Sequence, residues 1–224
     1  MNLKELVGVL GHELRTPLAA ILGYQELLAD GIFGELDQRT EEPLARIESS
    51  ALQLLYLIDG LQELTAGASK TDELESTTTD ALIARLVDAA RPFAESRGVR
   101  LQPADHQPAA LAQVPLQRLL RASALTTIAA VKSSTQRTIL LDVCVEPPDI
   151  LIRLSGTALD PLQDAPDLLL RPEGDRGPLT AARLRLAMAA ATLAHVHGSL
   201  ELLPEPEGTA VLLRMPVPVP ASPD

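Results

Sequence analysis

The chain has 224 residues, of which 30 are acidic and 19 basic, so its formal net charge is −11. Nucleic acids and anionic membranes bind clustered positive charge, so this balance argues against either as the main partner. No apolar stretch approaches the roughly 20 residues that span a bilayer, and the N-terminus lacks a signal-peptide pattern, so we expect a cytoplasmic protein. The single cysteine excludes an internal disulfide and any multi-cysteine metal site.

Two long amphipathic helices are predicted in the first third of the chain. Residues 2–30 carry apolar side chains at three- and four-residue spacing, and residues 39–65 repeat this pattern. Residues 31–38 have no helical period and contain glycines, so they form a turn and the helices make an antiparallel hairpin. A lone hairpin cannot cover its own apolar stripe, so we expect a homodimer in which two copies form a four-helix bundle.

The rest of the chain alternates between helix and strand patterns. The expected helices cover 80–96, 116–132 and 179–195, and the expected strands cover 99–102, 138–145, 150–154, 199–203 and 209–215. This order predicts an α+β protein, in which an α/β sandwich with helices on one face of a mixed sheet follows the hairpin. The expected units are the hairpin domain 1–66, a small and polar linker 67–79, the sandwich domain 80–216 and a disordered tail 217–224.

The first helix carries a histidine on the side opposite its apolar stripe. Successive helical residues rotate by about 100°, which places His12 about 200° from Leu10 and therefore in solvent. Its expected neighbours on that exposed side are mostly small and are Gly8, Arg15, Thr16 and Ala19. A neutral imidazole is a fair nucleophile near pH 7, and Glu13 is placed to accept the proton that the ring releases. A solitary exposed histidine is otherwise an ordinary surface residue.

Four segments together resemble the two-component sensor histidine kinases. They are HELRTPL from His12 to Leu18, QLLYLIDGLQEL from Gln53 to Leu64, HGSLEL and PEGTAVLLRMP. The resemblance implies a dimeric histidine phosphotransfer domain followed by an ATP-binding sandwich, with a response-regulator receiver domain as partner. It also implies that His12 is phosphorylated, that Glu13 assists phosphoryl transfer and that Thr16 assists dephosphorylation of the partner.

The sandwich half departs from the pattern of that family. The family holds Mg²⁺ through an asparagine on a helix that matches Arg118 to Val131, where this chain has Leu125 and Ala129. The only asparagine in the protein is Asn2, so no shift of register restores the ligand.

Two glycine-containing nucleotide motifs are also reduced. In place of DxGxG the chain has Ser155 and Gly156, and in place of GxGLG it keeps only Gly174 and Gly177. ATP and Mg²⁺ are expected for the family, but we expect this lobe to bind ATP poorly or not at all, with no cofactor or metal.

Three functions remain open at this stage. The first is phosphoryl exchange between His12 and an aspartate of a response regulator, which would bring its own Mg²⁺. The second is an ATP-dependent autokinase with a divergent nucleotide site, which would bind ATP saturably. The third is a non-catalytic dimerisation or regulatory module, whose binding would survive loss of His12.

Three other residues receive ordinary structural interpretations. His195 precedes a glycine at a helix end and is expected to cap carbonyls there. Cys144 lies in an alternating apolar strand and is expected to be a packed core thiol. His106 lies in a polar loop and has no evident role.

Overall fold

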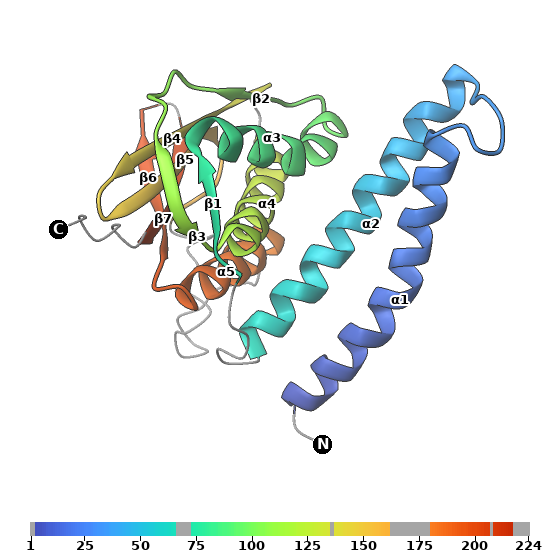
Figure 1. Ribbon diagram of the computed structural model, residues 1–224, viewed down its shortest axis with the longest axis horizontal. Helices are drawn as coiled ribbons and strands as arrows, with labels where there is room; N and C mark the ends of the chain where they lie inside the picture. Colours follow the sequence, from blue (N-terminus) through green and yellow to red (C-terminus); the bar gives the residue numbers. More distant parts are fainter. Residues whose placement is uncertain (1–2, 66–72, 135–136, 162–179, 207, 217–224) are drawn as a thin grey trace.

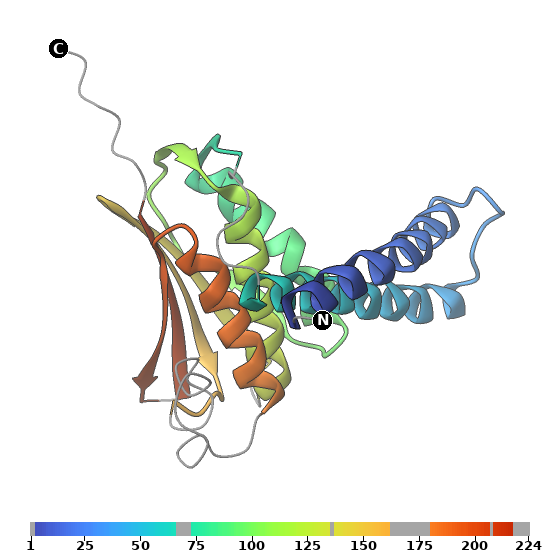
Figure 2. The same ribbon diagram turned by 90° about the horizontal axis from the view of Figure 1, so that it is seen from below.

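The computed structural model describes residues 3–65, 73–134, 137–161, 180–206 and 208–216. The chain forms a helical hairpin beside a lobe in which helices cover one face of a sheet (Figures 1 and 2). Seen from below, the layers follow one another as sheet, lobe helices, and then the hairpin (Figure 2). The predicted tail, 217–224, lies outside the described residues.

The hairpin consists of α1 (Leu3–Ala29) and α2 (Gln38–Thr65), as the apolar periodicity predicts. The two helices pack through a small apolar cluster of Leu18, Ala51 and Ile58, flanked by partly buried leucines. α1 continues through Pro17. Only one side of each helix is covered in this way, so the hairpin retains an open apolar face.

The described part of the lobe contains three helices and a five-stranded mixed sheet, which confirms the predicted fold class. Its helices are α3 (Thr79–Glu95), α4 (Leu116–Ser133) and α5 (Ala181–Ala194). Its sheet strands are β2 (Arg100–Pro103), β4 (Thr138–Glu146), β5 (Asp149–Thr157), β6 (Ser199–Glu205) and β7 (Gly208–Pro216). The strand order is β2-β4-β5-β7-β6, and only β2 and β4 are parallel.

Two short strands do not follow from the sequence pattern. β1 (Glu75–Thr78) and β3 (Ala110–Val114) pair antiparallel as a separate two-stranded sheet. The sequence placed residues 75–78 in the linker and residues 110–114 in a loop, because neither segment shows a clear alternation of apolar and polar residues. Thr78 also caps α3, since its hydroxyl accepts a hydrogen bond from the Ala81 amide.

Buried and less buried side chains alternate along β4, and this alternation places the cysteine on the outer face of the sheet. Ile139, Leu141 and Val143 point into the core beneath the helices. Cys144 follows Val143 and is exposed on the other face of the sheet, so the prediction of a core thiol is wrong. The strand carries apolar residues on both faces, and composition alone does not say which face the helices cover.

α2 lies directly against the helices of the lobe. Gly60 of α2 sits so close to α5 that a Cβ added there would come within 2.8 Å of the Cβ of Met188. About one turn before Gly60 on α2, the ring of Tyr56 contacts the ring of Phe93 of α3 edge-on, with 5.8 Å between ring centroids. The hairpin is therefore docked on the lobe by close packing at two points.

The loop before β3 is tied to the start of α3 by a histidine. Nε2 of His106 lies 2.6 Å from Oδ1 of Asp80 in the first turn of α3. This hydrogen bond is the main cause that raises the pKa of His106 above its ordinary value. The histidine with no evident role in the sequence thus joins two segments of the lobe.

The raised pKa makes the contribution of His106 to stability depend on pH. The folded protein binds the imidazole proton more tightly than the unfolded chain, so the stabilisation is fully present below about pH 6.5, the unfolded pKa. It is lost as the pH rises through the higher folded pKa. We expect His106→Gln to lower the melting temperature at pH 5.5 and to leave it nearly unchanged at pH 9, measured by circular dichroism. An equal loss at both pH values would contradict this assignment.

Candidate functional site

His12 lies on the outer surface of α1 with 81% of its side chain exposed. Its Nδ1 is 3.7 Å from Oε1 of the neighbouring Glu13, whose side chain is 74% exposed. Thr16, one helical turn later, is also exposed. The outward direction that the helical period predicts for His12 is confirmed, and all three candidate residues share an open surface.

The residue before His12 fixes the spacing between the two hairpin helices. Gly11 is buried, and a Cβ at this position would clash with the side chain of Gln62 on α2. The two helices approach closely here because glycine has no side chain. This contact holds one side of α1 against α2 and turns the adjacent His12 toward solvent.

Arg15 does not lie free beside His12 as the helical period suggests. Its Nη2 and Nε donate to Oδ1 of Asp59 on α2 at 2.6 and 3.1 Å, and Nη2 also donates to Gln62. A long side chain at the border of the exposed face can turn toward either side of the helix. The carboxylate on α2 decides the direction.

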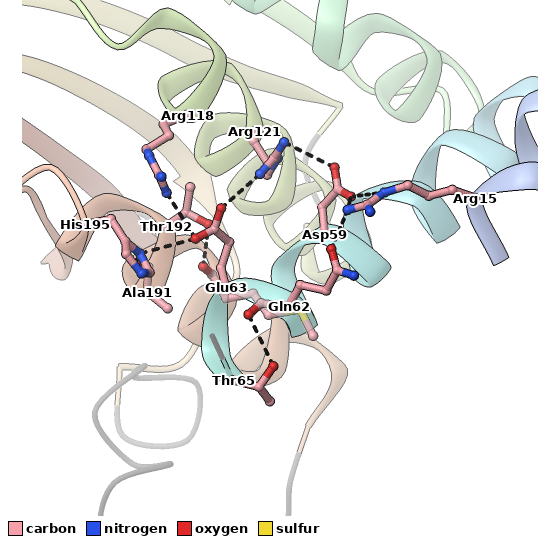
Figure 3. Close-up of polar contacts among 11 residues, drawn as sticks. Arg15, Asp59, Gln62, Glu63, Thr65, Arg118, Arg121, Ala191, Thr192 and His195 are labelled. Atoms are coloured by element: carbon pink, nitrogen blue, oxygen red, sulfur yellow. Dashed lines mark hydrogen bonds and ion pairs between the residues drawn. The ribbon is translucent and has the colours of Figure 1, made fainter. Parts of the chain in front are cut away.

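A cluster of charges joins α2 to α1, α4 and α5 (Figure 3). We call it the interdomain ion-pair cluster; its members are Arg15, Asp59, Glu63, Arg118, Arg121 and His195. Oδ2 of Asp59 lies 3.3 Å from Nη2 of Arg121, and Oε1 of Glu63 lies 3.1 Å from Nη1 of the same arginine. Oε2 of Glu63 accepts from Nη1 of Arg118 at 3.0 Å.

His195 completes this cluster at the end of α5. Its Nδ1 lies 2.7 Å from the carbonyl oxygen of Ala191 and 3.3 Å from Oε2 of Glu63. The predicted contact with a helical carbonyl is therefore present, and the carboxylate is an additional partner. The cluster was not predicted from the sequence; the four-residue spacing of its two carboxylates on α2 and the three-residue spacing of its two arginines on α4 are the local signals for it.

The nucleotide positions of the resemblance are filled by packed or bonded residues. Leu125 and Ala129 on α4 are fully buried within the core of the lobe and offer no ligand atom for Mg²⁺. The hydroxyl of Ser155 donates to Oε1 of Glu205 at 3.1 Å. These described positions thus carry two buried apolar side chains and a serine bonded to a glutamate. Gly174 and Gly177 lie outside the described residues.

Basic side chains gather where the end of α4 meets the start of α5. Burial lowers the pKa of Lys132, and the nearby charges of Arg185 and Arg97 lower it further. Burial also lowers the pKa of Arg185, whose Nε has no hydrogen-bond partner. Within the described ranges, Arg185 bonds only the Ala181 carbonyl and has no ion-pair partner. Neither the buried Arg185 nor the exposed Lys132 beside it was predicted from the sequence as part of a charged group.

The described residues also lack two other kinds of feature. They contain no group of three or more histidine, cysteine, aspartate or glutamate side chains arranged to hold a metal ion. None of their helices combines the length and the apolar character needed to cross a membrane.

Comparison with known proteins identifies the hairpin. Residues 2–68 match the model of the His Kinase A (phospho-acceptor) domain. The sensor histidine kinase TrcS of Mycobacterium tuberculosis is 38% identical over 106 residues, which cover 46% of this chain and 20% of TrcS. The non-motile and phage-resistance protein of Caulobacter vibrioides is 37% identical over 105 residues, covering 43% of this chain and 12% of that protein. The matched segment thus spans a fifth or less of each curated relative.

Solved structures resemble the chain over nearly its whole length. Full-length ShkA in complex with AMPPNP has a TM-score of 0.60 at 22% identity, covering 98% of this chain and 47% of ShkA. The histidine kinase AdeS of Acinetobacter baumannii has a TM-score of 0.53 at 16% identity, covering 93% and 98%. These likenesses establish the fold of a histidine kinase catalytic core. Residues 2–68 therefore carry a His Kinase A (phospho-acceptor) domain, and the chain as a whole has the fold of the histidine kinase structures that it resembles.

Proposed function

We propose that this protein exchanges a phosphoryl group between His12 and an aspartate of a response regulator. Nε2 of His12 attacks the phosphorus of the aspartyl phosphate, so an N–P bond forms while the P–O bond to the carboxylate breaks. The ring proton leaves from Nδ1, and Glu13 accepts it after its Oε1, which lies 3.7 Å from that nitrogen in the free protein, closes to hydrogen-bond distance in the complex. The observation that carries this proposal is the open surface around His12, which leaves room for a partner domain.

Thr16 is assigned the second role that the resemblance implies. Its hydroxyl lies on the same exposed surface, one helical turn after His12. In this role it assists the hydrolysis of the regulator's aspartyl phosphate, after which the regulator is inactive. His12, Glu13 and Thr16 would thus serve phosphoryl transfer and dephosphorylation of the regulator on one surface.

A second copy of the chain is proposed to cover the open face of the hairpin. Leu10, Leu14 and Ile21 of α1 and Ile47 and Leu54 of α2 are each more than 40% exposed. Several of them line a groove of about 410 Å³ between the two helices. Burying this face against its own copy would form the four-helix bundle and remove the apolar surface from water.

The direct test is transfer of radioactive phosphate from a purified response regulator. We expect a ³²P-labelled regulator to lose label as this protein gains an acid-labile, base-stable label. We also expect no label after incubation with ³²P-ATP, because Leu125 and Ala129 provide no Mg²⁺ ligand. Failure to accept label from any regulator of the source genome would contradict the proposal.

An ATP-dependent autokinase is the second candidate, and one observation favours it. Lys132 and Arg185, which has no ion-pair partner among the described residues, place positive charge near the end of α4, where it could neutralise phosphate oxygens. The similar protein ShkA is solved with AMPPNP. Isothermal titration of Mg²⁺–ATP at millimolar concentration decides between the two. We expect no heat of binding, and a saturable isotherm would favour the autokinase.

A further inference from the structure

Asp59 contacts both the phosphoacceptor helix and the lobe. Its Oδ1 accepts from Arg15 of α1 at 2.6 Å, and its Oδ2 lies 3.3 Å from Nη2 of Arg121 on α4 (Figure 3). The Asp59 side chain is only 12% exposed, so water screens these contacts weakly. One carboxylate is therefore shared between two cations that belong to different parts of the molecule.

The second carboxylate of α2 belongs mainly to the lobe. Glu63 contacts Arg118, Arg121 and His195, and none of these lies on α1. The Arg118 side chain is 7% exposed, so this part of the cluster is nearly dry. Glu63 thus holds the lobe against α2 without any contact to the phosphoacceptor helix, whereas Asp59 connects the two.

Arg15 is close enough to His12 to respond to a charge placed there. Residues three apart on a helix are surface neighbours, with Cβ atoms about 5–6 Å apart. A phosphoryl group on His12 would carry close to two negative charges and three acceptor oxygens, and arginine is a preferred partner of such a group. It would therefore compete with Asp59 for the guanidinium of Arg15.

We infer that Arg15 moves between Asp59 and the phosphoryl group of His12, and that this exchange couples phosphorylation to docking of the lobe. The inference rests on the proposed function. While Arg15 pairs with Asp59, it neutralises that carboxylate and repels Arg121. When Arg15 turns to the phosphoryl group, Asp59 pairs with Arg121 alone and the lobe docks more tightly. Arg15 and Asp59 are positioning residues in this scheme.

The coupling is reciprocal by thermodynamic necessity. If phosphorylation of His12 tightens docking by a given factor, docking stabilises phosphorylated His12 by the same factor. A docked lobe rests on α2, so it leaves the surface around His12 open for a regulator. The exchange of Arg15 thus holds the phosphorylated protein in the docked arrangement, in which the phosphoryl group on His12 is exposed.

A buried thiol at the interface would report docking directly. Met188 is 2% exposed and lies against Gly60 of α2, so release of the lobe uncovers it. We would introduce Met188→Cys in the full-length Cys144→Ser protein and measure alkylation by N-ethylmaleimide. The rate is proportional to the undocked fraction. A Val143→Cys protein, with its thiol inside the lobe, reports unfolding of the lobe as a control.

The unphosphorylated variants give the first test. We expect Arg15→Gln to slow alkylation of the thiol at 188 several-fold, because Asp59 then serves Arg121 alone. Asp59→Asn and Glu63→Gln should accelerate it several-fold, because each removes a carboxylate that holds the lobe. Asp149→Asn, which breaks a carboxylate–Arg214 pair on the sheet, should leave the rate unchanged. An unchanged or faster rate in Arg15→Gln would overturn the inference.

Phosphorylation gives the second test. Phosphoramidate transfers its phosphoryl group to the imidazole without ATP or a regulator: the N–P bond of the reagent breaks, ammonia leaves, and the ring releases a proton. We expect phosphorylated protein to react several-fold more slowly at position 188, and the effect to vanish in Arg15→Gln and Asp59→Asn but persist in Glu63→Gln. An equal rate before and after phosphorylation would overturn the coupling. Failure of His12 to accept phosphate would instead contradict the proposed function, while the unphosphorylated variants still decide the exchange.

Discussion

Alanine at position 12 removes all phosphoryl transfer from a labelled regulator, leaving only the level seen without protein. The imidazole forms the N–P bond, and no other described side chain on that surface of α1 is a nitrogen nucleophile. Because His12 is 81% exposed and packs against nothing, the substitution should leave the fold and the melting temperature unchanged. The loss would therefore report chemistry and not unfolding. The measurement is the time course of ³²P on each protein after rapid mixing.

Two further variants sharpen this experiment. Glu13→Gln keeps the size of the side chain but cannot take the ring proton, so we expect transfer about a hundredfold slower. His106→Gln removes a histidine from the lobe and should transfer at the normal rate. Normal transfer by the protein with alanine at position 12 would refute the assignment. If the unaltered protein binds the regulator but transfers nothing, and binding survives loss of His12, the non-catalytic module becomes the better description.

Asparagine at position 129 destabilises the lobe and does not create a nucleotide site. Ala129 is fully buried among apolar side chains of α4 and its neighbours, so an amide there adds volume and polar atoms without partners. Overpacking and an unsatisfied amide together cost about 2–4 kcal/mol of unfolding free energy. We expect urea unfolding to report this loss, and calorimetry with Mg²⁺–ATP to detect no binding.

An exposed alanine on the neighbouring helix provides the matched control. Ala84 of α3 lies on the solvent side, so Ala84→Asn changes the same atoms without burying them. Its cost should be limited to the difference in helix propensity, about 0.5 kcal/mol. A stable Ala129→Asn protein that binds ATP would show that the site needs only the missing ligand, and would favour the autokinase.

Periodicity was sufficient to predict most of the fold. The apolar spacing of α1 and α2 and the alternation in β4 and β5 reflect burial on one side of each element. Such one-sided burial can be predicted from the local sequence. β1 and β3 are short and hold each other through backbone hydrogen bonds, which leave little trace in side-chain order. Whether the face of β4 that carries Cys144 is buried depends on which face the helices cover, and this is set by tertiary packing.

Part of the candidate site could likewise be predicted from the sequence, and part could not. The outward direction of His12 follows from rotation along one helix, so seven matching residues and a helical period suffice to predict it. The partners of Arg15 and Arg121 do not, because Asp59 lies 44 and 62 positions away along the chain. The Arg15–Asp59 pair forms when the two hairpin helices pack together, and the Arg121–Asp59 pair forms only when the hairpin rests on the lobe. The sequence pattern gives no indication of where the partners of these charges lie.

The absence of a side chain at Gly60 constrains evolution as well as packing. Since a single methyl group there would collide with the Cβ of Met188, any lineage that acquires alanine at 60 must take glycine at 188 or hold the two halves farther apart. Positions 60 and 188 should therefore co-vary among orthologues. In orthologues with larger residues at both positions, we expect the lobe to stand farther from the hairpin and the charged residues around Asp59 to vary.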